Sequence, residues 1–213
     1  MKPRVLICVL CMTQGRWIHP LLAQALLAMS HDERFASTIE FVTDVFPVAK
    51  ARNTAVVRAR ERGATWCVMI DADQSFPPTG NCLDVLEAAA PDMRVIAMPA
   101  CMQDLRPNFH RVLEQCGDFF EVHYAGSGVL LIHRDIWQNP GPWFSWTTVP
   151  GDELGTTAES EDMFFCSRVR REGFKVWMSS KWAAHWKVMD ATGCGMHLRQ
   201  LEAQAKTAVL AGN

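Results

Sequence analysis

Short apolar runs alternate with longer amphipathic stretches through the first hundred residues, and this alternation limits the possible folds more than any other feature. The runs at residues 5–11, 38–42, 65–70 and 94–98 have the length and residue types of buried strands. The stretches at residues 18–29, 48–62 and 81–90 are expected to be helices. Because strands separated by helices favour parallel βαβ units, the sequence predicts an α/β fold.

The second half of the chain has a different pattern. Residues 119–122, 128–132 and 175–178 are typical of strands, and helices are expected near residue 136, at 161–173 and at 196–210. Pro, Gly and Trp are frequent at residues 139–157, and residues 143–159 have the composition of a lid. Since no repeat or linker divides the chain, we expect one domain over residues 1–213, with a nucleotide-binding-like half at about 1–100 and a mixed half at about 101–213.

Composition restricts the class of protein. The formal net charge of −2 and the pI near 6.4 give no overall attraction to nucleic acid or to an anionic membrane. No apolar run reaches the length of a membrane-spanning helix, and the first apolar run is read as a strand rather than a signal peptide. Eight cysteines are scattered along the chain, and Cys8 and Cys11 point to opposite faces of the first predicted strand. We expect buried thiols in a cytoplasmic protein.

Two carboxylates, Asp71 and Asp73, come directly after the apolar run at residues 65–70. In an open α/β sheet, ligands gather beyond the carboxyl ends of the strands, and a divalent metal that accompanies a phosphorylated substrate suits a carboxylate pair there. Asp is also common where a strand turns, so an ordinary polar turn stays open as the alternative.

A cation falls on the apolar side of the helix predicted at residues 48–62. Helical spacing places Arg52 on the stripe formed by Val48, Ala55, Val56 and Ala59, which should face the sheet. Arg52 with its neighbour Asn53 suits contact with a ribose, base or phosphate. The alternative is an arginine whose stem covers apolar surface while its head reaches water.

Glu161 and Asp162 begin the helix predicted at residues 161–173 and share a face with its apolar residues. A carboxylate placed in this way can act as general base towards an acceptor hydroxyl. The alternative is that both side chains only complement the helix dipole. Further along the chain, His185 is a candidate donor to Mn²⁺, in competition with other histidines. Gly126-Ser127-Gly128 precedes a strand and is expected to allow a ligand close to the backbone.

Together these pieces, in their order along the chain, resemble GT-A glycosyltransferases, in particular small family-2-type transferases, over about residues 5–187. The matching pieces are Arg52-Asn53, Asp71-Ala72-Asp73, Gly126-Ser127-Gly128, Pro142-Trp143-Phe144, Glu161-Asp162, Gly173-Phe174-Lys175-Val176-Trp177 and His185. The resemblance implies a Rossmann-like nucleotide-binding half fused to a mixed acceptor-side half. The turn after the first strand, Cys11-Met12-Thr13-Gln14, departs from the family's usual Pro-Thr-Tyr-like turn.

The resemblance also implies roles for individual residues. Asp71 and Asp73 would be the D-x-D pair, with Asp73 the direct ligand of Mn²⁺ or Mg²⁺ and His185 completing the metal site. Asp162 would be the base of an inverting enzyme, with Glu161 beside it. Thr13 would meet the nucleotide, and Arg52 lies in the segment that borders it.

The sequence therefore predicts a metal-dependent transferase that moves a sugar from a nucleotide-diphosphate sugar to an acceptor hydroxyl. A UDP-sugar is the favoured donor, and the acceptor is a saccharide, a protein or a nucleic acid. Two alternatives stay open: a nucleotidyltransferase, and a nucleotide- or glycan-binding module without turnover. Trp143 and Trp146 are expected to form an acceptor wall, whereas Trp66 and Trp177 are expected in the core.

Overall fold

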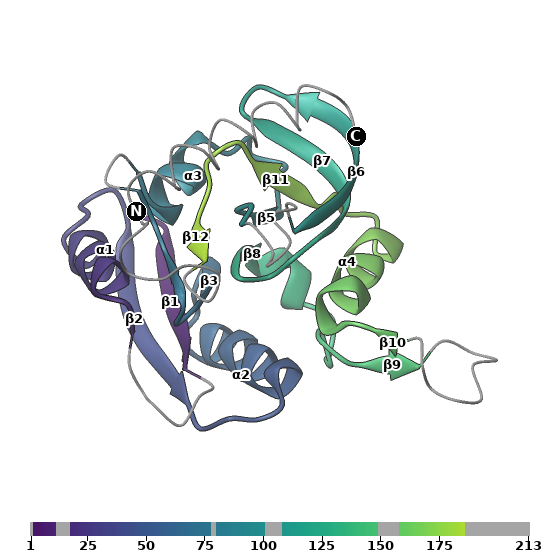
Figure 1. The fold of residues 1–213 in the computed structure, drawn as a ribbon, viewed down its shortest axis with the longest axis horizontal. Helices are drawn as coiled ribbons and strands as arrows, with labels where there is room; N and C mark the ends of the chain where they lie inside the picture. Colours follow the sequence, from purple (N-terminus) through teal and green to yellow (C-terminus); the bar gives the residue numbers. More distant parts are fainter. Residues whose placement is uncertain (1, 12–17, 78–79, 101–107, 149–157, 186–213) are drawn as a thin grey trace.

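One eight-stranded sheet, in the order β2-β1-β3-β8-β5-β11-β7-β6, organises the fold (Figure 1). The computed structural model describes residues 2–11, 18–77, 80–100, 108–148 and 158–185. The strands of the sheet are β1 (Arg4–Cys11), β2 (Ala36–Thr43), β3 (Trp66–Asp71), β5 (Val95–Ala97), β6 (Phe109–Cys116), β7 (Phe119–Ala125), β8 (Val129–His133) and β11 (Trp177–Ser179). Two short antiparallel pairs accompany it: β4 (Gln74–Ser75) with β12 (Ala184–His185), and β9 (Thr147–Thr148) with β10 (Ala158–Glu159).

The helices are α1 (Pro20–Ser30), α2 (Val48–Glu61), α3 (Cys82–Ala88), η1 (Arg134–Trp137) and α4 (Glu161–Arg171). Local sequence explains their ends. Asn81 accepts the Leu83 N–H and forms a capping box with Asp84 at the start of α3, and Ser160 accepts the Met163 N–H at the start of α4. Gly63, with φ of 60°, follows α2 in the left-handed conformation that glycine adopts at low cost.

The predicted α/β fold class is confirmed, and the predicted strands and helices of the described residues are found close to their expected bounds. The eight-residue strand β6 was not predicted, because it lies at the sheet edge and most of its side chains are exposed, so it has no apolar run. The two-residue strands β4, β9, β10 and β12 were also missed. The helix predicted at residues 196–210 lies outside the described residues.

The sheet is parallel from β2 through β1 to β3 and between β5 and β11, and its other pairs, all of which include a strand from the second half of the chain, are antiparallel. β1 pairs in parallel with β2 and β3, as the βαβ pattern indicates. β8 then inserts antiparallel between β3 and β5. The Asp71 N–H donates to the Gly128 carbonyl at 2.8 Å, so the end of β3 meets the residue that precedes β8. Strand order thus joins two segments far apart in the sequence.

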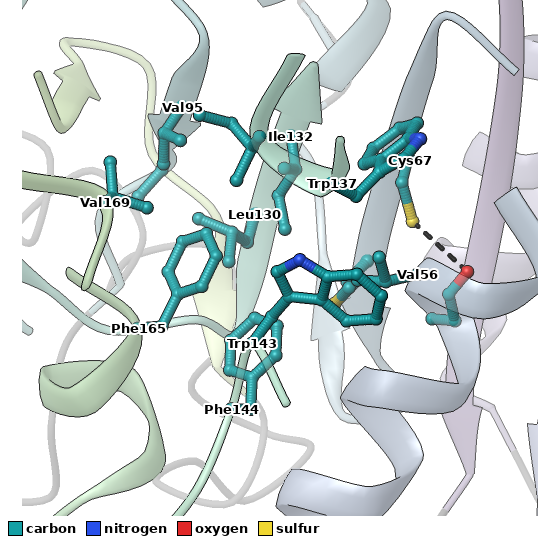
Figure 2. Close-up of a cluster of buried hydrophobic side chains, with 14 of the residues drawn as sticks. Val56, Cys67, Val95, Leu130, Ile132, Trp137, Trp143, Phe144, Phe165 and Val169 are labelled. Atoms are coloured by element: carbon teal, nitrogen blue, oxygen red, sulfur yellow. Dashed lines mark hydrogen bonds between the residues drawn. The ribbon is translucent and has the colours of Figure 1, made fainter. Parts of the chain in front are cut away.

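Apolar layers cover both faces of the sheet. Cys8 belongs to one layer and Cys11 to the other, which confirms that they point to opposite faces. The layer that holds Cys8 contains apolar residues of both α2 and α4. In this layer the rings of Phe144 and Phe165 stack with centroids 4.5 Å apart (Figure 2). α2 and α4 therefore pack on the same side of the sheet.

Five of the six described cysteines are buried, as expected, and Cys116 on β6 is exposed. Within the described ranges, no helix is long and apolar enough to cross a membrane.

Phe165→Ala tests the packing between α4 and the sheet. Removing this buried, stacked ring is expected to lower the free energy of unfolding by about 3–5 kcal/mol, measured by urea denaturation. Met163→Ala on the same helix, where the side chain is 39% exposed, should change it by less than about 0.5 kcal/mol. Equal losses in the two variants would contradict this packing.

Candidate functional site

Arg52 on α2 is the centre of the candidate site. Its Nη1 and Nη2 donate to Oδ1 and Oδ2 of Asp71 at 3.2 and 3.3 Å, and Nη1 also donates to the Ser127 carbonyl at 2.9 Å. Its Nε lies 3.7 Å from Oε1 of Glu161. Arg52 is only 3% exposed. Its buried guanidinium thus connects the last residue of β3, the glycine segment at residues 126–128 and the first residue of α4.

The predicted inward position of Arg52 is confirmed. Ala51 and Ala55 beside it are fully buried, so small side chains bring α2 close to the sheet while the long arginine extends along it. Arg58 and Arg62, predicted on the opposite side, are more exposed and pair with Glu40. Arg52, which was predicted to contact a ribose, base or phosphate, is therefore bound to protein carboxylates. These contacts position protein segments and do not form an open phosphate site.

The charges around Arg52 explain why it tolerates burial. Burial alone would lower the pKa of the guanidinium, but the charge and hydrogen bonds of Asp71, with the charges of Asp162 and Glu161, raise it above its ordinary value. Burial, followed by the charge of Asp162, raises the pKa of the Glu161 carboxyl, and the charge of Arg52 opposes that rise. The arginine and its carboxylates therefore depend on one another electrostatically.

Glu161 and Asp162, adjacent at the start of α4, have different surroundings. Glu161 is buried against Arg52, whereas Asp162 is half-buried. Asp162 makes no hydrogen bond or ion pair to the other described residues, although it is close enough to shift the pKa values of Arg52 and Glu161. Of the two predicted catalytic carboxylates, Glu161 is the one that lies against Arg52.

Asp73 and His185 lie together, as the predicted metal site requires. β4 pairs with β12 so that Gln74 is opposite His185, and Nε2 of His185 lies 3.5 Å from Oδ2 of Asp73. Both side chains are partly exposed. Asp71, the third predicted ligand, pairs with Arg52. The first and second aspartates of the D-x-D pair thus have different contacts.

A carboxylate oxygen and an imidazole nitrogen suit Mn²⁺, and a carboxylate suits Mg²⁺. The part of the chain that the structure describes holds no group of three or more His, Cys, Asp or Glu side chains arranged for a metal ion. Such ions commonly take one or two protein ligands and fill their other positions with substrate phosphates and water. Asp73 and His185 fit a metal that arrives with a diphosphate, and they do not form a closed structural site.

The glycine segment between β7 and β8 makes room for protein side chains. A ligand contact by Gly126, Ser127 and Gly128 stays a prediction. A Cβ at Gly126 would lie 2.6 Å from Nδ2 of Asn108, and a Cβ at Gly128 would lie 3.0 Å from Nε2 of Gln74. Asn108 in turn accepts the Ala100 N–H through Oδ1 at 2.8 Å. The glycines therefore allow Asn108 and Gln74 to pack against the backbone that carries Ser127.

Asn53 and Trp143 were also predicted to contact ligands, but both contact other parts of the protein. Asn53 Oδ1 accepts the N–H groups of Trp143 and Phe144, and its Nδ2 donates to the Phe144 carbonyl at 2.8 Å. Trp143 is 3% exposed and belongs to the core (Figure 2), so its predicted place in an acceptor wall is wrong. Trp146, which precedes β9, is 53% exposed. Asn53 fixes the backbone that directs Trp143 inward.

Thr13 and most of the predicted lid, residues 149–157, lie outside the described residues. Gln74 and Asn108 were not singled out from the sequence, although both lie against the glycine segment. Gln74 follows the D-x-D pair directly, but a single polar residue gives no periodic signal that distinguishes a buried position from a turn.

No protein-family model and no curated protein sequence matches this chain. Solved structures do match it in fold. A197 from STIV is 19% identical, with a TM-score of 0.61 over 88% of this chain and 86% of that one. UDP-glucose pyrophosphorylase complexed with UDP-glucose is 8% identical, with a TM-score of 0.51 over 100% of both chains. UTP-bound UGPase from Acinetobacter baumannii is also 8% identical, with a TM-score of 0.50 over 99% of both chains.

At these sequence identities the likeness shows the fold alone. The chain has a mixed α/β, Rossmann-like fold of the kind found in proteins that handle nucleotide sugars, and the match extends over nearly the whole chain.

Arg52→Met tests the central ion pairs. It removes the buried guanidinium that pairs with Asp71 and lies beside Glu161, so the free energy of unfolding at pH 7 should fall by about 3 kcal/mol. This value is at the lower end for a broken buried pair because Asp71 is partly exposed. Arg58→Met, which removes a surface ion pair of the same helix, should cost less than about 1 kcal/mol. Urea denaturation measures both values.

The loss in Arg52→Met should depend on pH. The pKa of Glu161 is already above its ordinary value of 4.5, and it rises further without Arg52. A carboxyl whose pKa is raised on folding costs stability as the pH rises through that pKa, because it must ionise in the folded state. The difference from wild type should therefore be smallest near pH 4.5 and grow towards pH 7. A difference that is constant over this range would contradict the ion pairing.

Proposed function

We propose that this protein transfers a sugar from a nucleotide-diphosphate sugar, with a UDP-sugar favoured, to an acceptor hydroxyl with inversion. The observation that carries the proposal is the meeting of three separate candidate motifs at Arg52: Asp71, the Ser127 carbonyl and Glu161. The fold shared with UDP-glucose pyrophosphorylase complexed with UDP-glucose supports a nucleotide-sugar donor.

Asp73 and His185 are the residues that would hold Mn²⁺ or Mg²⁺. When bound, the ion supplies positive charge to the diphosphate that leaves as the glycosyl bond breaks. Asp71 does not need to reach the ion for this arrangement to work, because its contact with Arg52 fixes the end of β3 and hence the turn that carries Asp73. Arg52 acts here as a positioning residue.

Asp162 is the proposed general base. The acceptor hydroxyl must lose its proton as it attacks the sugar carbon. Asp162 is the α4 carboxylate that makes no hydrogen bond or ion pair to the other described residues. Glu161 holds Arg52 from the same helix turn. Trp146 offers an exposed ring on which a saccharide acceptor can stack.

Nucleotidyl transfer is the second candidate, favoured by the likeness to two UDP-glucose pyrophosphorylase structures over nearly the whole chain. That reaction needs a glycine-rich, basic turn after the first strand, and the corresponding Thr13-Gln14-Gly15-Arg16 lies outside the described residues. The two reactions give different products. Release of pyrophosphate from UTP and glucose 1-phosphate would indicate nucleotidyl transfer, whereas release of UDP from UDP-glucose indicates glycosyl transfer or donor hydrolysis.

Asp162→Asn separates chemistry from donor binding. The amide cannot accept the proton, so the rate of UDP release from UDP-glucose should fall by about 10²–10⁴-fold. Donor affinity measured by calorimetry should stay within about twofold of wild type. Asp118→Asn, an exposed aspartate in the turn between β6 and β7, is the matched control and should keep the full rate. Equal rates in Asp162→Asn and wild type would remove Asp162 as the base.

Asp73→Ala tests the metal contact. In wild type, Mn²⁺ should tighten UDP binding, because an ion held by Asp73 and His185 would supply positive charge to the diphosphate. In Asp73→Ala and His185→Ala, UDP should bind no better with Mn²⁺ than without it. Asp92→Ala, which removes an exposed carboxylate outside the site, should keep the response to Mn²⁺. A retained response in both site variants would place the ion elsewhere.

A further inference from the structure

Two neutral polar side chains at the candidate site are buried without a hydrogen-bond partner. Gln74 is 3% exposed, and its Oε1 has no partner among the described residues. Ser127 is 2% exposed, and its Oγ likewise has none in the described parts of the chain. Buried polar atoms are nearly always paired, and an unpaired one lowers stability, so each such atom needs an explanation.

The two side chains belong to one small region. Gln74 directly follows Asp73 and is opposite His185 in the β4–β12 pair. Its amide reaches the backbone next to Ser127, where a Cβ at position 128 would be 3.0 Å from Nε2. The carbonyl of Ser127 accepts from Arg52. Gln74 therefore links the strand pair that carries His185 to the segment whose Ser127 carbonyl Arg52 holds.

Packing alone does not account for these residue types. A methionine at position 74 or an alanine at position 127 would fill nearly the same volume without a desolvated polar atom. Trp143 also has a buried Nε1 without a partner, but it lies in the core under α2, near Arg60. Gln74 and Ser127 differ from Trp143 because they border the glycine segment and the predicted metal pair.

We propose that Gln74 and Ser127 form a hydroxyl-binding wall that takes the sugar part of the donor and selects among sugars. Gln74 Oε1 and Ser127 Oγ accept hydrogen bonds from hydroxyl groups of the sugar. A nucleoside diphosphate has no hydroxyl groups in this part of the site. The proposal rests on the proposed function and deepens it. A sugar whose hydroxyl is absent or turned away leaves these buried atoms unpaired, and such sites discriminate strongly between ligands.

The test compares Gln74→Met and Ser127→Ala with wild type in the full chain. Calorimetry in the presence of Mn²⁺ gives the affinities for UDP, UDP-glucose, UDP-galactose and GDP-mannose. Wild type should bind one nucleotide sugar more tightly than the corresponding nucleoside diphosphate. Each variant should lose about tenfold of that preference, the effect of one hydrogen bond, while its affinity for UDP changes less than twofold.

Thermal unfolding of the free proteins gives a second readout. Because Gln74 Oε1 and Ser127 Oγ have no partner among the described residues, neither variant should melt at a lower temperature than wild type. Gln138→Met replaces an exposed glutamine and is the matched control, which should leave both the sugar preference and the melting temperature unchanged.

The possible outcomes distinguish failure of the hydroxyl-binding wall from failure of the proposed transferase function. If wild type binds UDP with Mn²⁺ but shows the same affinity for all nucleotide sugars, or if the variants keep the full sugar preference, the wall is overturned and the donor site stands. A lower melting temperature with unchanged preference would assign both residues to folding and also overturn the wall. If wild type binds no nucleotide, both the wall and the proposed function fail.

Discussion

The pairing of the buried Arg52 guanidinium with carboxylates is the interaction on which the candidate site depends. An isolated buried cation is expensive, and it is tolerated here because Asp71, Glu161 and Asp162 supply opposite charge and the Ser127 carbonyl accepts a hydrogen bond. These partners come from β3, the segment before β8 and the start of α4. Each group offsets the burial of the others, so the segments are fixed together, and Asp73 and Asp162 are placed as a consequence.

Strand order decides which residues meet. β8 comes from the second half of the chain, yet it lies between β3 and β5, and its antiparallel entry brings Gly128 to the N–H of Asp71. The apolar layer under α2 and α4 then holds the two helices on one face. Asn53 completes this side by fixing the backbone of Trp143 and Phe144. The same packing that stabilises the fold therefore sets the geometry of the carboxylates.

Periodicity was sufficient to predict the buried strands, the helices and the inward position of Arg52, because these follow from local spacing. It could not predict the partners of Arg52, because these depend on the insertion of β8, which no local pattern encodes. Asn53 and Trp143 have residue types common in ligand sites, but Asn53 binds the backbone of Trp143 and Phe144, and Trp143 is buried in the core. β6 lacked the apolar run by which the buried strands were found.

The most direct test is a crystal structure with UDP and Mn²⁺, with the ion located by its anomalous scattering. The account predicts one manganese peak bound by Asp73, His185 and the diphosphate, with Arg52 still paired to Asp71 and the Ser127 carbonyl. A manganese ion away from Asp73 and His185, or an Arg52 side chain that has left Asp71 to bind the nucleotide, would contradict it.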